Sequence, residues 1–316
     1  MPGHQRHAGF HQADRKSLNS FQEQNMFKNV DRILVAVQDL DQAEQNYRNI
    51  LGATPIEDFE SRYLNAKVRR IALGASEVEL CQPLGPGPIA TRLQEKGEGL
   101  VCGGVTTDDL TSFAKHLDER GVPYVAADDR IYPESTSLYG LPLAVSASPQ
   151  PPRPRANGPV EYLYELTMVL KTSWGTVAQH YADAFGLDRE NEVGIVFARF
   201  GYEGALLKFD ADRLDRIELS EAHDTAYPMG RYTARHGDAL YMCYVETDDL
   251  ADIIARLDKH GCRWTRRTTT PVERDGLWIH PSALNGILLG VSRSSLAWGW
   301  SGKPEWVQPL RADETA

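Results

Sequence analysis

Short apolar runs rich in β-branched residues alternate along the chain with stretches whose apolar residues recur at helical spacing. Residues 30–37 form an apolar run typical of a strand buried in a sheet. Asp39 then offers an N-cap, and the apolar residues after it share one helical face up to Gly52. Three shorter strand patterns follow at 56–60, 68–73 and 77–81. The pattern predicts a β-α-β-β-β unit.

The same order of elements recurs three more times. Strand patterns at 100–106, 124–126, 131–132 and 141–146 surround a helix capped by Asp108 or Asp109, and two further units occupy about 162–221 and 239–292. The repetition is also visible in the letters, because TTDDLTSFAKHLDERG at 106–121 returns as ETDDLADIIARLDKHG at 246–261. Tyr47 and Gly52 likewise match Tyr181 and Gly186, 134 positions later. Such a long period indicates two homologous halves of two units each.

These units divide the chain into two domains joined by a proline-rich segment. We expect the first domain at 28–147, a linker at 148–159, where prolines disfavour helix and central strand, and the second domain at 160–294. Residues 1–27 are polar and predict a disordered extension, although His4, His7 and His11 could share a helix face and bind a metal. Residues 295–316 form a tail whose three tryptophans are expected to dock on the protein.

Composition narrows the class of partner. The 316 residues carry a net charge of −10, which argues against nucleic acid or an anionic membrane, and no apolar run is long enough to span a bilayer. The four cysteines show no close pairing, which favours free thiols in a reducing cytoplasm. We therefore expect a cytoplasmic protein with a small-molecule partner. A homo-oligomer stays open.

Paired β-α-β-β-β units, with GEGL at 97–100 and WIHPSALNGILL at 278–289, resemble the vicinal oxygen chelate superfamily. That superfamily includes glyoxalase I, methylmalonyl-CoA epimerase, bleomycin-resistance proteins and extradiol dioxygenases. EVELCQPL at 77–84 is similar to the epimerases, whereas four units in two domains are similar to extradiol dioxygenases. The resemblance covers about residues 28–292. It implies an α+β fold of two glyoxalase-like domains, each a curled mixed sheet around a cup.

In that family each cup holds a divalent metal through side chains on four strands. The matching positions are Arg32, Glu79, Cys102 and Ala144 in the first domain and Leu166, Glu218, Met242 and Gly290 in the second. No histidine occupies any of them, and neither set supplies the three or so donors that a metal needs. We therefore predict neither a metal nor another cofactor, which disfavours iron-dependent ring cleavage.

Two glutamates remain as candidate chemistry. Arg32 is expected to face Glu79, as a structural salt bridge, which we favour, or as an anion-binding group for a substrate carboxylate. Glu218 is expected in a cup lined by Leu166, Met168, Met242 and Tyr244. A lone carboxyl in apolar surroundings has a raised pKa and can move protons near neutral pH, unless a nearby Arg or Tyr satisfies it.

Trp278 and His280 lie on the strand before the last one of the second cup. Trp278 is expected to line the pocket; a lone histidine there is more often structural, but His280 is kept beside Glu218 as a catalytic candidate. The favoured hypothesis is an enzyme of the lyase or isomerase kind, acting by metal-independent acid/base chemistry on a small hydrophobic, aromatic or carbonyl-bearing metabolite. The alternatives are a metal-free binding or sequestering protein of the bleomycin-resistance kind, and an extradiol-type dioxygenase with unusual ligands.

Overall fold

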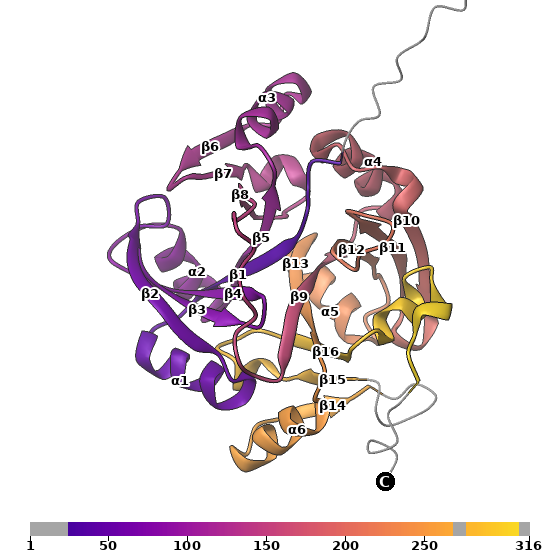
Figure 1. Ribbon diagram of the computed structural model, residues 1–316. Helices are drawn as coiled ribbons and strands as arrows, with labels where there is room; N and C mark the ends of the chain where they lie inside the picture. Colours follow the sequence, from indigo (N-terminus) through magenta and orange to yellow (C-terminus); the bar gives the residue numbers. More distant parts are fainter. Residues whose placement is uncertain (1–24, 268–275, 310–316) are drawn as a thin grey trace, which may run out of the picture.

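The computed structural model describes residues 25–267 and 276–309, which form two domains of the same plan (Figure 1). The first contains β1 (Val30–Ala36), α1 (Leu40–Leu51), β2 (Thr54–Ser61), β3 (Ala66–Leu73), β4 (Ser76–Pro83), α2 (Pro88–Lys96), β5 (Gly99–Thr107), α3 (Leu110–Arg120), β6 (Tyr124–Ala127), β7 (Arg130–Pro133) and β8 (Leu143–Ala147). The second contains β9 (Val160–Leu170), α4 (Trp174–Phe185), β10 (Glu192–Phe197), β11 (Tyr202–Lys208), β12 (Arg216–Glu221), α5 (Pro228–His236), β13 (Ala239–Thr247), α6 (Leu250–Lys259), β14 (Trp264–Arg266), β15 (Gly276–Ile279) and β16 (Leu289–Arg293).

Each domain folds its eight strands into one mixed sheet. The first sheet has the order β2-β3-β4-β1-β5-β8-β7-β6, and the second has the order β10-β11-β12-β9-β13-β16-β15-β14. Adding eight to each strand number of the first sheet gives the second, so the duplication seen in the sequence extends to the strand pairing. The predicted α+β fold, with four β-α-β-β-β units that form two glyoxalase-like domains, is confirmed.

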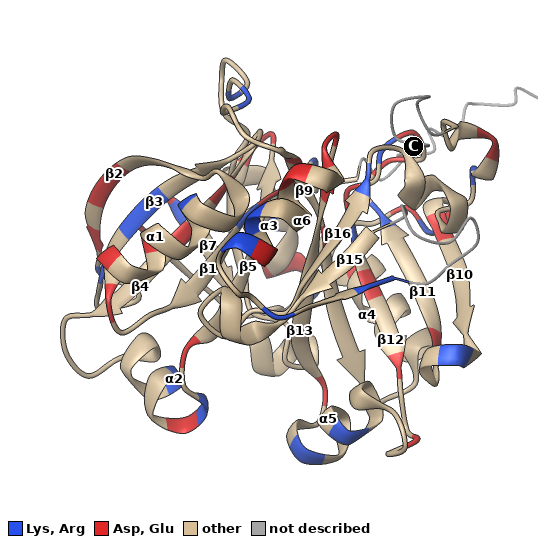
Figure 2. Ribbon diagram, turned by 90° about the horizontal axis from the view of Figure 1, so that it is seen from below, with Lys and Arg blue, Asp and Glu red and all other residues tan. Residues whose placement is uncertain are grey.

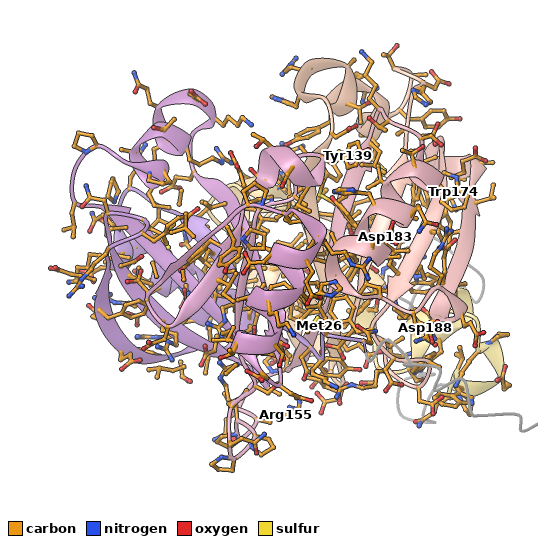
Figure 3. All side chains as sticks on the ribbon, turned by 90° about the horizontal axis from the view of Figure 1, so that it is seen from above. Met26, Tyr139, Arg155, Trp174, Asp183 and Asp188 are labelled. Atoms are coloured by element: carbon orange, nitrogen blue, oxygen red, sulfur yellow. The ribbon has the colours of Figure 1, made fainter. Side chains whose placement is uncertain are left out.

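The two domains share one apolar core. Helix α1 packs against α6, and α3 packs against α4, so that each helix pair joins the two domains. Leu166 of β9 lies against Gly103 of β5, where a Cβ atom would collide with the leucine side chain. Met26 and Tyr139 mark the α3–α4 side of this junction in Figure 3. The inner face of each sheet points away from this core and forms the cup.

Phe27 belongs to the shared core, although it precedes the first strand. Its side chain is 1% exposed, and its ring centroid lies 4.9 Å from that of Phe185, 5.3 Å from Phe209 and 5.5 Å from Phe113. The sequence prediction that placed residue 27 in a disordered extension is therefore wrong, because partners distant in the sequence bury it. The rest of that prediction, with His4, His7 and His11, lies outside the described residues.

Phe27→Leu is expected to lower the free energy of unfolding by about 1 kcal/mol, because a smaller side chain loses ring contacts with three aromatic neighbours. Urea denaturation of the two proteins would measure the difference. An unchanged midpoint would show that these ring contacts contribute nothing to stability.

Two helices that the sequence pattern did not predict lie below the sheets in Figure 2. Helix α2 begins at Pro88 and buries Ile89 in the apolar cluster of the first cup. Helix α5 begins at Pro228, and the ring of Tyr232 meets that of Tyr241 edge-on at 4.8 Å. A proline at the first helical position is compatible with a helix start.

The two segments outside the sheets also pack on them. Residues 148–159 contain neither helix nor strand, and Arg153 reaches Asp31 at 2.7 Å and Glu77 at 2.9 Å. In the C-terminal tail, Trp298 is 8% exposed and Ser301 is fully buried. The tail is therefore docked on the second domain. No helix among the described residues is long and apolar enough to cross a membrane.

Candidate functional site

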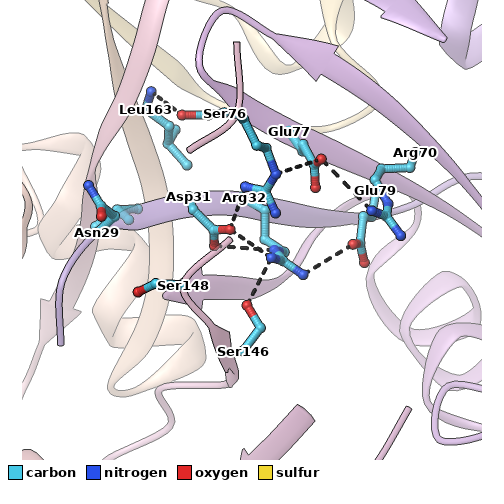
Figure 4. Close-up of polar contacts among 12 residues, drawn as sticks. Asn29, Asp31, Arg32, Arg70, Ser76, Glu77, Glu79, Ser146, Ser148 and Leu163 are labelled. Atoms are coloured by element: carbon cyan, nitrogen blue, oxygen red, sulfur yellow. Dashed lines mark hydrogen bonds and ion pairs between the residues drawn. The ribbon is translucent and has the colours of Figure 1, made fainter. Parts of the chain in front are cut away.

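The first cup holds a closed cluster of charges. Glu79 on β4 has no exposed surface, and both of its carboxylate oxygens accept hydrogen bonds from the guanidinium of Arg130, at 2.6 and 2.8 Å. Arg32 lies 3.5 Å from the same carboxylate, as the sequence predicts, but its closest acceptors are Asp31, at 2.6 Å, and Ser146, at 2.9 Å (Figure 4). Arg130 was missed, because nothing in the sequence placed β7 opposite Glu79. The carboxylate is fully held within the protein.

The rest of the first cup is filled with apolar side chains. Tyr132 stacks on Tyr63 with ring centroids 3.9 Å apart, and Cys102 and Ala144 are buried in the same cluster as Leu34. Burial raises the pKa of the Cys102 thiol, so this sulfur is a poor thiolate donor. The first cup is therefore organised as a structural ion-pair cluster.

In the second cup β9 contains a β-bulge, as β1 of the first cup does at Asp31. Tyr244 of β13 pairs with Glu165, and the next residue, Val245, pairs with Leu163, so Tyr164 is an extra residue on β9. Beyond this bulge the inward positions are Glu165 and Thr167. Leu166 and Met168, predicted to line the cup, lie in the core shared by the domains.

The two cups are related strand by strand. On β1 and β4, Arg32 pairs with Glu77 and Leu34 with Glu79; on β9 and β12, Glu165 pairs with Arg216 and Thr167 with Glu218. The true counterpart of Arg32 is thus Glu165. The offset of 134 holds for the helices but is one too large for these strands, since one more residue separates Val169 from Trp174 than separates the equivalent Ala36 from Leu40. One residue is enough to reverse the faces of a strand.

Glu218 lies in a buried polar cluster. Its Oε1 accepts a hydrogen bond from Ser220 at 2.6 Å, and its carboxyl group also hydrogen-bonds that of Glu165. Glu165 in turn accepts from Arg216 Nε and from the Thr167 hydroxyl, each at 2.7 Å. Arg216 Nη1 donates a hydrogen bond to the Ser301 hydroxyl of the tail at 2.9 Å. Arg216 Nη2 has no hydrogen-bond partner among the described residues.

This environment favours the protonated form of Glu218. Burial raises the pKa of Glu218 to about 8, and the negative charge of Glu165 adds to the rise, whereas the Ser220 hydrogen bond and Arg216 oppose it. The two cups differ in how their glutamates are held, because neither arginine beside Glu79 has an arginine at the equivalent position in the second cup. Arg32 is replaced by Glu165, and Arg130 is replaced by Gly276, since both Arg130 and Gly276 pair with the equivalent serine of the next strand. Among the described residues, no guanidinium hydrogen-bonds the carboxyl group of Glu218.

Aromatic side chains surround this cluster. Met242 pairs with Thr167, and Tyr244 pairs with Glu165, so both lie in the cup as the sequence predicts. Trp278 Nε1 donates a hydrogen bond to Tyr244 Oη at 2.7 Å. Two further aromatic residues complete the wall: Tyr202, whose pKa is raised by burial and by Glu218, and Phe200, whose ring meets that of Trp278 edge-on at 5.5 Å.

His280 occupies a different position from the one predicted for a catalytic residue. It follows the end of β15 and caps a short 3₁₀ turn (Pro281–Ala283), where Nδ1 accepts a hydrogen bond from the Ser282 backbone N–H at 3.3 Å. The Ser282 hydroxyl lies 3.1 Å from the same nitrogen. These are the contacts of a helix-capping residue. A catalytic role for His280 gains no support from them.

A groove of about 400 Å³ lies between the two domains, outside both cups. Its lining is polar and includes Asp39, Asn46, Glu98, Ser282 and Asn285. Glu98 already accepts hydrogen bonds from the Gln38 backbone N–H, at 2.8 Å, and from Asn285, at 2.9 Å. Because the Glu98 carboxylate already has these two partners, the groove is a weaker candidate for a catalytic site than the second cup.

The side chains that could act as metal ligands in the two cups do not fit the divalent metal that the fold family implies. In the second cup Glu165 is neutralised by Arg216, Glu218 favours its protonated form, and Met242 and Gly290 occupy the neighbouring strands. In the first cup two guanidinium groups surround the one carboxylate. The described residues contain no group of three or more His, Cys, Asp or Glu side chains arranged for a metal ion.

Protein purified without added metal is expected to contain well under one equivalent of iron, zinc, manganese or cobalt, because each cup places a guanidinium where a cation would be attracted. Elemental analysis before and after dialysis against a strong chelator measures this directly. A near-stoichiometric metal that leaves with loss of ligand binding would contradict the interpretation of the cups.

Comparison with known proteins agrees with this architecture. Residues 31–139 match the family described as the Glyoxalase/Bleomycin resistance protein/Dioxygenase superfamily. No curated protein matches the chain.

Three solved structures show the likeness. A triple mutant of 4-hydroxymandelate synthase from Streptomyces coelicolor is 15% identical, with a TM-score of 0.66 over 84% of this chain and 92% of that chain. A xylose isomerase-like TIM barrel/4-hydroxyphenylpyruvate dioxygenase fusion protein is 10% identical, with a TM-score of 0.57 over 89% of this chain and 53% of that chain. Methylmalonyl-CoA epimerase from Mycobacterium tuberculosis is 20% identical over 44% of this chain and 91% of that chain, with a TM-score of 0.37.

At these identities the likeness to the synthase and the fusion protein shows the fold alone. The family match covers most of the first domain, and the second domain repeats its strand order and its inward-facing glutamate. Residues 31–139 are therefore similar to this family, and the chain is built from two domains of the same fold.

Proposed function

We propose that the chain is an enzyme whose second cup moves a proton next to the carbonyl group of a small, hydrophobic or aromatic metabolite, without a metal. The observation that carries this proposal is the buried carboxyl of Glu218, whose pKa is raised to about 8. A general acid/base works best when its pKa lies near the working pH. The first cup, where Arg130 holds the equivalent carboxylate, serves the fold.

Glu218 and Arg216 have separate roles in such a reaction. In its ionised form Glu218 accepts the proton from the carbon next to the carbonyl, and the electron pair of that C–H bond moves to the carbonyl oxygen as an enolate forms. Arg216 Nη2, the donor without a partner, is available to hydrogen-bond that oxygen. Return of the proton to carbon completes an isomerisation, and expulsion of a group from the adjacent carbon completes an elimination.

Hydrogen–deuterium exchange tests the proposal before the natural substrate is known. Aryl alkyl ketones, arylacetaldehydes and aromatic 2-oxo acids, all with a C–H bond next to the carbonyl, would be incubated with the protein in D2O containing a chelator and followed by proton NMR. We expect protein-dependent loss of the signal next to the carbonyl for at least one compound. Glu203→Gln, which alters an exposed carboxylate on β11, is the control. Compounds that bind but exchange no faster than in buffer would instead favour the metal-free binding protein.

The raised pKa of Glu218 also predicts how stability depends on pH. A carboxyl whose folded-state pKa, about 8, exceeds its ordinary value favours the folded state at low pH, and this contribution is lost as pH rises from about 4.5 to 8. Glu218→Gln should therefore gain stability relative to the unchanged protein as pH rises from 5.5 to 8.5. Urea denaturation of both proteins at the two pH values measures this. A difference that does not change with pH would contradict the assignment.

A further inference from the structure

The second cup contains a second guanidinium, that of Arg267. This residue lies just after β14 and opposite Gly276 of β15. Arg267 follows β14, and its backbone N–H donates to the Gly276 carbonyl at 2.9 Å. Its residue is 6% exposed, and the guanidinium carbon lies 3.8 Å from the ring centroid of Trp300 in the tail. Stacking on an indole fixes the plane of the guanidinium group.

Two nitrogens of the Arg267 side chain have no hydrogen-bond partner in the part of the chain that the structure describes. Nε and Nη1 of Arg267 are buried, and neither donates a hydrogen bond among the described residues. The positive charge of Arg267 acts on Tyr202 and Tyr244, whose hydroxyl groups also experience the field of Glu218, so the guanidinium belongs to the second cup. Buried guanidinium N–H groups are normally paired, which makes this arrangement typical of a ligand site.

The equivalent place in the first cup shows which ligand group is missing. The pairing of Trp264 with Ile279 corresponds to that of Tyr124 with Pro133, which makes Ala127 and Arg130 the counterparts of Arg267 and Gly276. Each cup thus carries one arginine at this pair of positions, on opposite strands. In the first cup the arginine holds the carboxylate of Glu79 with two hydrogen bonds; in the second, no carboxylate among the described residues is bonded to Arg267.

We infer that Arg267 binds the carboxylate of a small aromatic acid, whose ring lies among Phe200, Tyr202 and Trp278. The carboxylate of the ligand takes at Arg267 the place that Glu79 takes at Arg130. A carboxylate is favoured over a neutral acceptor because Arg216 already neutralises Glu165, so that among the described residues no carboxylate pairs with Arg267. That this acid is the substrate rests on the function proposed above, whereas its binding does not.

Three pairs of probes of matched shape test the inference: benzoate with benzamide, phenylacetate with phenylacetamide, and 3-phenylpropanoate with 3-phenylpropanamide. Isothermal titration calorimetry of the full chain at neutral pH, with a chelator present, would measure each affinity. At least one acid is expected to bind about tenfold or more tightly than its amide. No preference for the acid in any pair would overturn the inference.

Substitutions at Arg267 test whether this residue causes the preference for the acid over its amide. Arg267→Gln should abolish it while leaving amide affinity within about twofold, and Arg267→Lys, which keeps the charge but not the planar donors, should restore part of it. Arg266→Gln is the matched control, because its guanidinium stacks on Trp264 and should leave the preference intact. Melting curves confirm that the variants are folded; if Arg267→Gln does not fold, the Lys variant carries the comparison. Survival of the full preference in a folded Arg267 variant would overturn the inference.

Glu218→Gln separates this inference from the proposed function. It should lose exchange activity yet keep the preference for the acid, since Arg267 is unchanged. A protein that prefers the acid but exchanges no hydrogen would retain the binding site and refute only the proposed chemistry.

Discussion

Glu218→Gln is expected to slow hydrogen exchange next to the substrate carbonyl by ~10²–10⁴-fold, with little change in ligand affinity. Glutamine keeps the size of the side chain and can still hydrogen-bond Ser220 and Glu165, but it cannot accept or release a proton at the working pH. Rates from proton NMR in D2O and affinities from calorimetry would be compared for the two proteins.

The matched variant for this experiment is Glu79→Gln, which makes the same chemical change at the equivalent position of the first cup. Measured on the folded fraction, it should exchange hydrogen at close to the normal rate, since Arg130 and Arg32 hold Glu79 away from chemistry. Normal exchange by Glu218→Gln would refute proton transfer by this residue. An inactive Glu79→Gln protein beside an active Glu218→Gln protein would place the reaction in the first cup.

Glu79→Gln is expected to lower the free energy of unfolding by about 3–5 kcal/mol. The substitution removes the charge that balances Arg130 and Arg32, and both guanidinium groups remain buried beside a neutral amide. Chemical denaturation followed by tryptophan fluorescence would give the value for the variant and the unchanged protein.

A double variant shows whether the loss comes from the unbalanced guanidinium. Glu79→Leu combined with Arg130→Met replaces the pair with apolar side chains of similar size and should recover much of the stability lost in Glu79→Gln. A loss of less than about 1 kcal/mol in the single variant, typical of an exposed pair, would show that this ion pair is not the closed cluster described here.

The fold could be predicted from the sequence because its signals are local and repeated. Apolar periodicity marked the strands, and capping residues such as Asp39 and Asp109 with closing glycines such as Gly52 and Gly121 marked the helices. The duplication then fixed the order of units. Helices α2 and α5 were missed, because each is short and starts at a proline that also suggests a loop.

The site could be predicted only in part, because strand faces depend on single-residue offsets. Glu218, Met242, Tyr244 and Trp278 lie in the second cup as predicted. Leu166 and Met168 do not, since the extra residue between Val169 and Trp174 places Glu165, and not Leu166, at the position of Arg32. A search for charged residues beside the expected strand positions would have drawn attention to Glu165. After burial, the charge of Glu165 is the largest cause of the raised pKa of Glu218.

Arginine partners were hardest to foresee. Arg130 lies on the short strand β7, next to the edge strand of its sheet, and Arg267 directly follows the edge strand β14. The sequence does not show which segment opposite a glutamate carries a guanidinium. Arg153 reaches the first cup from the segment between the domains. Long side chains that cross from one element to another leave no periodic signal, and only the three-dimensional arrangement shows that the cups differ in how their carboxyl groups are held.

The protonation state of Glu218 is the central claim, and it can be measured without a substrate. Infrared difference spectra of protein labelled with ¹³C-glutamate, recorded as pH is raised and corrected with spectra of Glu218→Gln, would isolate the protonated carboxyl band of this residue. We expect that band to disappear with a midpoint near pH 8, as burial and Glu165 require. Disappearance near pH 4.5, the ordinary value for a glutamate, would contradict the account of the second cup as a proton-transfer site.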